Sequence, residues 1–222
     1  MSRLPVRMRD DSGTRMAYGA TLGLIIASIV VTIASGTPGA APATAGVLQG
    51  FALLFTLSVS GVTRRTLLVA MVLGVAAAST ATAVTQLSLG SSPVIAPVLW
   101  ALIVASTIAA IVRHLGRVAR VDAQTVMALL SIYLLLGLFF GYAFMLTDAL
   151  TGGFFVHGET AAGSFVYFSF VTITTLGYGD LVPQEGLPRA LAVTEAIIGQ
   201  LYLVSVVALA VSRMTRKKAE RA

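Results

Sequence analysis

The chain carries the heptad Thr-Thr-Leu-Gly-Tyr-Gly-Asp at residues 174–180, with Gly177 and Gly179 at alternate positions. Glycine adopts left-handed backbone conformations with little penalty, whereas residues with a Cβ resist them. Left-handed conformations at alternate positions turn neighbouring backbone carbonyls toward the same side, where their oxygens can replace the water around a bare cation. The heptad therefore predicts a cation site lined by carbonyl oxygens.

The heptad resembles the selectivity filter of the potassium channel family, which usually reads Thr-Val-Gly-Tyr-Gly-Asp from the second threonine onward. The departure is Leu176, which stands where the family has valine. Leucine keeps the carbonyl and changes only the packing behind it, so we expect K⁺ selectivity to survive. We also expect the side chains of Leu176 and Tyr178 to point back into protein. The resemblance implies a K⁺ site formed by Thr175, Leu176, Gly177, Tyr178 and Gly179, with Asp180 at the outer mouth.

The composition indicates an integral membrane protein. Of 222 residues, 57% are hydrophobic and 11% are charged, and there is no cysteine. A soluble domain has about a quarter of its residues charged, and the absence of cysteine excludes disulfides and cysteine-based metal sites. Membrane topology alone concentrates basic residues in loops, so the net charge of +6 does not predict a nucleic-acid partner. We predict no cofactor and no soluble ligand, only K⁺ as the permeant ion.

Uncharged stretches divide the chain into six predicted membrane spans, since a crossing helix needs about 20 apolar residues. Residues 16–63 and 66–112 carry no charge, and each stretch is interrupted by a turn rich in glycine, proline or serine. The predicted spans are 16–34, 45–62, 66–87, 93–112, 123–146 and 188–212. A basic N-terminus before an apolar run also describes a signal peptide, whose removal would leave the remaining topology unchanged.

Lysine and arginine predict the orientation, because cytoplasmic loops carry the excess. With a cytoplasmic N-terminus, fourteen of the fifteen Lys and Arg residues fall on the cytoplasmic side and Arg189 falls outside. We therefore predict a multi-pass protein of the plasma membrane with both termini in the cytoplasm. Four carboxylates fall on the outer face, where they would raise the local cation concentration: Asp148, Glu159, Asp180 and Glu185.

The last hundred residues resemble the pore unit of the family, which comprises an outer helix, a short re-entrant pore helix (here near 164–174), the filter and an inner helix. Six spans with the pore last resemble the voltage-gated-like superfamily. The resemblance implies an all-α membrane protein with six transmembrane helices, working as a homotetramer in membrane lipid because a ring of carbonyls needs four chains. The predicted organisation is a cytoplasmic N-terminus (1–15), a four-helix membrane domain (16–112), a cytoplasmic linker (113–122), a pore domain (123–212) and a basic cytoplasmic tail (213–222).

The fourth predicted span carries no arginine. A voltage sensor needs several there, because each charge crossing the field yields only about 2.3 kcal/mol per 100 mV. Arg113, Arg117 and Arg120 follow the span on one helical face, which favours an interfacial helix on anionic headgroups over a sensor of reduced charge. We predict a non-voltage-sensing channel of prokaryotic type. The opening stimulus, the conductance and auxiliary partners stay open, and the first four helices fit a packing scaffold or a lipid or tension sensor equally.

Two aromatic residues precede the heptad where family members often carry two tryptophans that brace the filter tyrosine. These are Tyr167 and Phe168. Tyr167 could also donate its hydroxyl to Asp180, which would tie the outer end of the filter to the pore helix. Simple aromatic packing is the alternative.

Glu195 is an ionisable residue about two turns into the sixth span, which calls for a functional hypothesis. We expect it to brace the pore helix from behind through a hydroxyl such as that of Thr172 or Thr174, with gating as the alternative. In the outer loop, His157 and Glu159 are expected to be solvated, although proton sensing or metal binding by the pair is conceivable.

Gly199 lies 19 residues beyond Asp180, at the position of the family's hinge glycine. Glycine inside a helix costs about 1 kcal/mol relative to alanine, so a local reason for it is expected. Bending of the inner helix is favoured over close helix packing. Residues that continue along the same face are expected to line the cavity, with a lipid-facing stripe as the alternative: Leu203, Val207 and Val211.

The resemblance implies a potassium-selective channel that conducts K⁺ passively and is not an enzyme. A cation channel of relaxed selectivity and a non-conducting regulatory subunit are the first rivals. A membrane enzyme is the rival from another class, but it would need a nucleophile with a base, or a metal cluster, within the spans. Glu195 is the one acidic residue inside the predicted spans, and Arg189 stands at the outer edge of the sixth.

Overall fold

The computed structural model describes residues 17–34, 94–116, 123–158 and 161–219. The helices in these ranges are α2 (Ala17–Ala34), α5 (Ile95–Leu115), α6 (Ala123–Thr151), α7 (Ala162–Ile173) and α8 (Leu187–Ala219). These ranges contain no strand, only an isolated β-bridge between Phe155 and Pro183. This part of the chain is therefore all-helical, as predicted. The predicted spans 45–62 and 66–87 lie outside the described residues.

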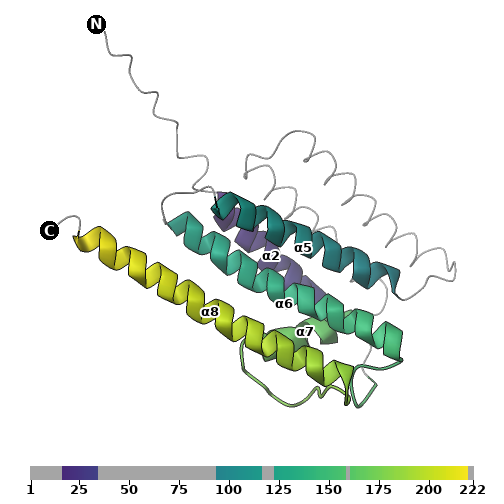
Figure 1. Cartoon of the computed structure of the whole chain (residues 1–222). Coiled ribbons are helices and arrows are strands. Elements are labelled where there is room, and N and C mark those ends of the chain that lie inside the picture. Colours follow the sequence, from purple (N-terminus) through teal and green to yellow (C-terminus); the bar gives the residue numbers. More distant parts are fainter. Residues whose placement is uncertain (1–16, 35–93, 117–122, 159–160, 220–222) are drawn as a thin grey trace, which may run out of the picture.

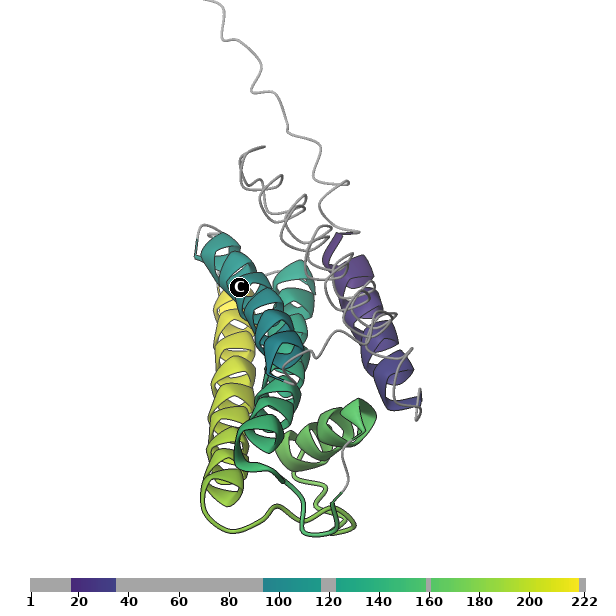
Figure 2. The ribbon, with the colours of Figure 1, turned by 90° about the vertical axis from the view of Figure 1, so that its right-hand side faces the viewer.

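Helix α6 lies at the centre of the arrangement, because α2, α5, α7 and α8 all pack against it. In Figure 1 the helices α5, α6 and α8 run side by side. Figure 2 shows α2 and α8 on opposite sides of α6, with the short α7 lying obliquely across one end. We call this end, where α7 and the loops between α6 and α8 gather, the filter end.

Helix α6 continues five residues beyond the predicted end of the fifth span, from 146 to Thr151. Asp148 does not break the helix, because its carboxylate accepts a hydrogen bond of 2.7 Å from the N–H of Phe154 in the following loop. The helix ends where Gly152 takes a φ of 76° and its N–H bonds to the carbonyl of Asp148 at 2.9 Å. A left-handed glycine is the usual way to satisfy the last carbonyls of a helix.

Helix α8 begins after a left-handed Gly186 (φ 82°) and has Pro188 in its first turn, where the missing N–H of proline costs nothing. It continues to Ala219, so residues 213–219 of the predicted basic tail belong to this helix. Lysine and arginine are good helix formers and suit the partially negative end of a helix. Basic residues therefore prolong the helix rather than end it.

Among the described residues, three helices are long and apolar enough to cross a membrane by length and composition. These segments are Ile95–Arg113, Gln124–Thr151 and Leu187–Leu209. Helix α2 is also apolar and has 18 residues, at the short end of the length that spans a hydrocarbon core. The helices predicted near 16–34, 93–112, 123–146 and 188–212 are thus present.

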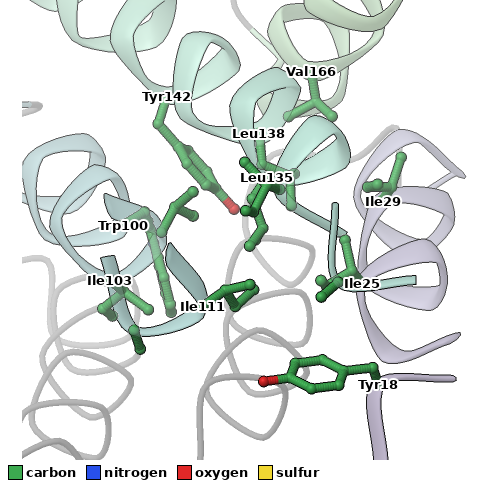
Figure 3. Close-up of a cluster of buried hydrophobic side chains, with 14 residues drawn as sticks. Tyr18, Ile25, Ile29, Trp100, Ile103, Ile111, Leu135, Leu138, Tyr142 and Val166 are labelled. Carbon is green, nitrogen blue, oxygen red and sulfur yellow. The ribbon is translucent and has the colours of Figure 1, made fainter. Parts of the chain in front are cut away.

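The main apolar cluster joins α2, α5 and α6, with Val166 contributed by α7. Figure 3 shows these side chains converging from the surrounding helices. Ile25, Ile111 and Leu135 are fully buried there, and the rings of Trp100 and Tyr142 stack with centroids 6.4 Å apart. In lipid this interdigitation, rather than hydrophobic exclusion from water, holds helices together.

Glycines let the backbone of α7 approach its neighbours. A Cβ added to Gly137 of α6 would lie 2.8 Å from the ring of Phe170, and one added to Gly141 would lie 3.1 Å from the Cα of Val166. At the start of α7, a Cβ on Gly163 would lie 2.8 Å from the carbonyl oxygen of Thr32 in α2. Small residues allow such close contact in membrane helices, so α7 is held against both α6 and α2.

A cluster of phenylalanines holds the loop after α6 against α7. Phe154 of the loop lies 4.7 Å from Phe144 of α6 and 6.0 Å from Phe165 of α7, measured between ring centroids. Tilted and edge-to-face arrangements at such distances are the favoured ones for aromatic pairs. The phenylalanines of the cluster are Phe140, Phe144, Phe154, Phe155, Phe165 and Phe168.

Backbone hydrogen bonds join the loop before α7 to the loop after it. The N–H of Val156 donates to the carbonyl of Val182 at 3.0 Å, and the N–H of Gln184 donates to the carbonyl of Phe154 at 2.8 Å. We call this pairing of residues 154–156 with residues 182–184 the loop clasp. It closes the segment that contains α7 and the heptad at its base.

Candidate functional site

The backbone of the heptad alternates between conformations, as predicted. The φ angles of Thr175, Gly177 and Gly179 are 61°, 59° and 77°, whereas Leu176 and Tyr178 between them do not have positive φ. Thr175 adopts the left-handed conformation despite its Cβ, at a cost of roughly 1–2 kcal/mol. The alternation therefore includes the threonine as well as the two glycines.

Successive carbonyls of the heptad point away from α7. The N–H groups of Thr175, Leu176 and Gly177 donate to carbonyls in the last turn of α7 at 3.0, 2.9 and 3.2 Å. No cis peptide bond occurs among the described residues, and in a planar trans peptide the carbonyl points opposite to the N–H that follows it. The carbonyls of residues 174–176 are therefore all directed to the side of the heptad that faces away from α7.

The last turn of α7 is held in place from α6. The hydroxyl of Tyr133 donates to the carbonyl of Ile173 at 2.8 Å. The C-terminal end of α7 carries the partially negative end of its dipole, which favours a nearby cation. Tyr133 was not singled out from the sequence, where it is one tyrosine in an apolar span.

The outer end of the heptad is tied to the middle of α7. The hydroxyl of Tyr167 donates to Oδ2 of Asp180 at 2.8 Å, which confirms the predicted bond. The hydrogen bond to Asp180 raises the pKa of the Tyr167 phenol, so the hydroxyl keeps its proton and acts as the donor.

Phe168 faces the phenylalanine cluster. Its aromatic contacts within the described residues are with Phe144, Phe154 and Phe155. In the single chain Leu176 is 57% exposed and Tyr178 is 66% exposed. The two side chains were expected to point into protein, and the single chain does not cover them. The expectation that Phe168 braces Tyr178 stays a prediction.

Glu195 meets α7 at Ser169. The Oγ of Ser169 lies 2.5 Å from Oε1 of Glu195. The sequence-based expectation of Thr172 or Thr174 was wrong, because the Thr174 hydroxyl is satisfied one turn back by the carbonyl of Phe170. Ser169 is the missed residue. Its signal in the sequence is a hydroxyl in the middle of an otherwise apolar stretch of α7.

Gly199 lies against the end of α7. A Cβ added to it would overlap Cγ1 of Ile173 and lie 3.3 Å from the carbonyl oxygen of Ile173. This is the close helix packing that was the alternative to a hinge, and α8 is continuous through this position. Leu203 and Val207 are 39% and 54% exposed.

Two residues predicted from the sequence lie outside the part of the chain whose side chains the structure describes. Val211 lies on α8 beyond the last side chains that the structure describes, and Glu159 lies outside the described residues. His157 is exposed. The described residues contain no group of three or more His, Cys, Asp or Glu side chains suited to a metal ion.

Residues 128–216 match the model of a family described as "Ion channel". The chain is 36% identical over 102 residues to "Two pore potassium channel a" of Oryza sativa subsp. japonica, which covers 46% of this chain and 26% of that protein. It is 30% identical over 97 residues to "Two-pore potassium channel 1" of Arabidopsis thaliana, which covers 44% of this chain and 25% of that protein. The chain thus spans about a quarter of the length of these relatives. No solved structure matches it.

The matched region begins in α6 and ends in α8, so it contains α7, the heptad and the residues that contact them. The matched family is one of ion channels and not one of enzymes. The match and the apolar helices both support a membrane protein.

Proposed function

We propose that this protein is a potassium channel, which conducts K⁺ passively and selectively across the membrane through a pore formed by four copies of the chain. The observation that carries the proposal is the row of carbonyls at residues 174–176, directed away from α7 by hydrogen bonds on their far side. Carbonyl oxygens arranged in rings replace the hydration shell of K⁺. One chain supplies one strip of such oxygens, and a cyclic assembly of four completes the rings.

The side chains left uncovered in the single chain support an assembly. Leu176 and Tyr178 are exposed beside the filter, and α8 exposes an apolar face along its length. Spacings of four, four and three residues put this face on one side of the helix. It consists of Val193, Ile197, Leu201 and Val204, which are 55–65% exposed. Neighbouring copies would cover the filter side chains and part of this face.

In the membrane, the filter end would face outward, with both termini in the cytoplasm of a six-span subunit in the plasma membrane. Asp180 would stand at the outer mouth, and Thr175, Leu176, Gly177, Tyr178 and Gly179 would form the filter. Below it, Gly199 would allow the inner helix to bend, and the cavity would be lined by Leu203, Val207 and Val211. The absence of arginine in 93–112 leaves the channel without a voltage sensor of the usual kind.

Flux into liposomes tests the proposal. Purified protein should admit K⁺ and largely exclude Na⁺, and its mass in lipid nanodiscs should equal four chains. The variant Leu176→Val should keep the same flux ratio, because it changes only the packing behind the carbonyls. Equal K⁺ and Na⁺ fluxes would instead indicate a cation channel of relaxed selectivity, and absence of any flux from the tetramer would indicate a regulatory subunit.

Removing the hydroxyl of Tyr167 should make the current through the filter decay faster. We expect Tyr167→Phe to open with normal K⁺ selectivity but to lose current several-fold faster during sustained opening, because Asp180 loses a charge-assisted hydrogen bond. Single-channel recording in planar bilayers measures this decay. Asp180→Asn keeps an oxygen that can accept the bond and should decay more slowly than Asp180→Ala. If Tyr167→Phe decays at the wild-type rate, the ring contributes packing alone.

A further inference from the structure

A single hydroxyl stands between two acceptors where α6, α7 and α8 meet. The Oγ of Ser169 on α7 lies 2.5 Å from the carbonyl oxygen of Gly137 on α6 and 2.5 Å from Oε1 of Glu195 on α8. Both distances are at the short end of the range for O–H···O hydrogen bonds. A serine hydroxyl carries one proton, so it can donate to one of these oxygens only.

The second short contact therefore needs a proton from the other side. The carbonyl of Gly137 has none to give, so the proton must belong to the carboxyl group of Glu195. With Glu195 ionised, one of the two contacts would bring together lone pairs at 2.5 Å with no hydrogen between them. With Glu195 neutral, the carboxyl donates to Ser169 and Ser169 donates to Gly137.

The surroundings of Glu195 also favour the neutral acid. The residue is fully buried, and its Oε2 has no hydrogen-bond partner. An unpaired charge in such a place is far costlier than a neutral carbonyl oxygen. The ion pair found among the described residues joins Arg189, in the first turn of α8, to Glu185 in the loop before it, and both side chains are exposed, so this cation does not compensate Glu195.

Three tyrosines on these helices donate to oxygens other than those of Glu195. Tyr133 of α6 donates to the carbonyl of Ile173. Tyr167 of α7 donates to Asp180, and Tyr202 of α8 donates to the carbonyl of Leu129. The proton in the contact between Glu195 and Ser169 therefore comes from Glu195.

We propose that Glu195 is a neutral carboxylic acid that donates a hydrogen bond to Ser169, so that the chain of bonds from Glu195 through Ser169 to Gly137 positions the pore helix between the inner and outer helices. Glu195 is a positioning residue, since it acts on the filter through α7. Raising the pH removes its proton, reverses or breaks the bond to Ser169, and leaves two acceptors facing one donor. The pore helix is then released from one of its neighbours, and K⁺ flux falls as the pH rises. The effect on flux rests on the proposed channel function, whereas the protonation state does not.

Infrared spectroscopy of the protein in lipid tests the protonation directly. The wild type at neutral pH should show the carbonyl stretch of a protonated carboxylic acid, which carboxylates lack, and alkaline titration should remove it. Glu195→Gln should abolish this band at neutral pH. Glu185→Gln removes an 86% exposed carboxylate from the loop just before the same helix and should leave the band unchanged. A wild-type spectrum without the band at neutral pH would overturn the proposal, whether or not the protein conducts.

Flux at several pH values tests the consequence. Glu195→Gln keeps an N–H donor for Ser169 but cannot ionise, so its K⁺ flux should equal that of the wild type at neutral pH and stay constant under alkaline conditions. Glu195→Ala and Ser169→Ala each break the chain of bonds and should lower flux about tenfold. This factor corresponds roughly to the net free energy that one hydrogen bond contributes. If Glu195→Gln loses flux with rising pH as the wild type does, the coupling of Glu195 to the filter is wrong even where the infrared band is present.

Discussion

Alanine at position 177 should abolish K⁺ flux. Gly177 has a φ of 59°, and nothing lies within 4 Å of the position that a Cβ would take, so the penalty is conformational rather than steric. A left-handed residue with a Cβ costs roughly 1–2 kcal/mol, and four copies in one filter would raise this to roughly 4–8 kcal/mol. A filter strained to that degree relaxes to another backbone conformation and loses the ring of oxygens. Liposome flux of Gly177→Ala should fall more than about a hundredfold, the factor that corresponds to 2.8 kcal/mol.

Gly186→Ala is the matched control. Gly186 has a φ of 82° and equally open surroundings, but it lies in the loop before α8. The same backbone penalty there should leave the ion path unaltered, so Gly186→Ala should conduct like the wild type. Unaltered permeation in Gly177→Ala would remove the basis for a carbonyl-lined filter. Equal loss in both variants would point to a general folding defect instead.

Alanine at position 199 should displace the end of the pore helix. Its Cβ would overlap Cγ1 of Ile173 and press on the carbonyl oxygen of Ile173, next to the first carbonyls of the filter. Inserting a methyl group into a packed contact typically costs about 1–3 kcal/mol, and each of the four subunits would bear that cost. Flux through Gly199→Ala should fall by at least about tenfold, the equivalent of 1.4 kcal/mol.

A second substitution separates packing from bending at this position. Ile173→Ala removes the atom that the new Cβ would meet, so the double variant should recover most of the flux lost by Gly199→Ala. A double-mutant cycle measures this coupling. If Gly199 serves only as a hinge, Ile173→Ala cannot rescue it. Gly23→Ala, at a helical position with nothing within 4 Å, should have little effect and controls for the loss of a glycine in a membrane helix.

The parts of the site that the sequence predicts are those set by local chemistry. Alternating glycines predict alternating backbone conformations, and the structure has them at Gly177 and Gly179. Uncharged stretches predict the helices near 16–34 and 93–112 to within a few residues, whereas α6 and α8 continue five and seven residues beyond their predicted spans. The end of α6 was misplaced because the carboxylate of Asp148 finds its partner in the following loop, and a charge in the sequence looks the same whether or not it has a partner.

The partners that join separate helices could not be read from the sequence. Glu195 was expected to brace the pore helix through a hydroxyl, yet its contact is Ser169 rather than either threonine. The choice depends on how α8 is rotated and shifted against α7, and the close contact between Gly199 and Ile173 sets that register. The expectation that Leu176 and Tyr178 point back into protein stays a prediction for a different reason. A sequence does not tell whether a side chain will be covered by its own chain or by another.

The loop clasp holds the chain next to one end of α8. The clasp and the phenylalanine cluster anchor the chain just before this helix begins, whereas its 33 residues run without interruption to Ala219. At 1.5 Å per residue the helix is about 50 Å long. If α8 tilted as a rigid body about the filter end, a tilt of about ten degrees would carry its far tip through roughly 9 Å. Any gate driven by such a tilt would lie at the end of α8 far from the filter end, because the displacement is largest there and smallest at the filter end.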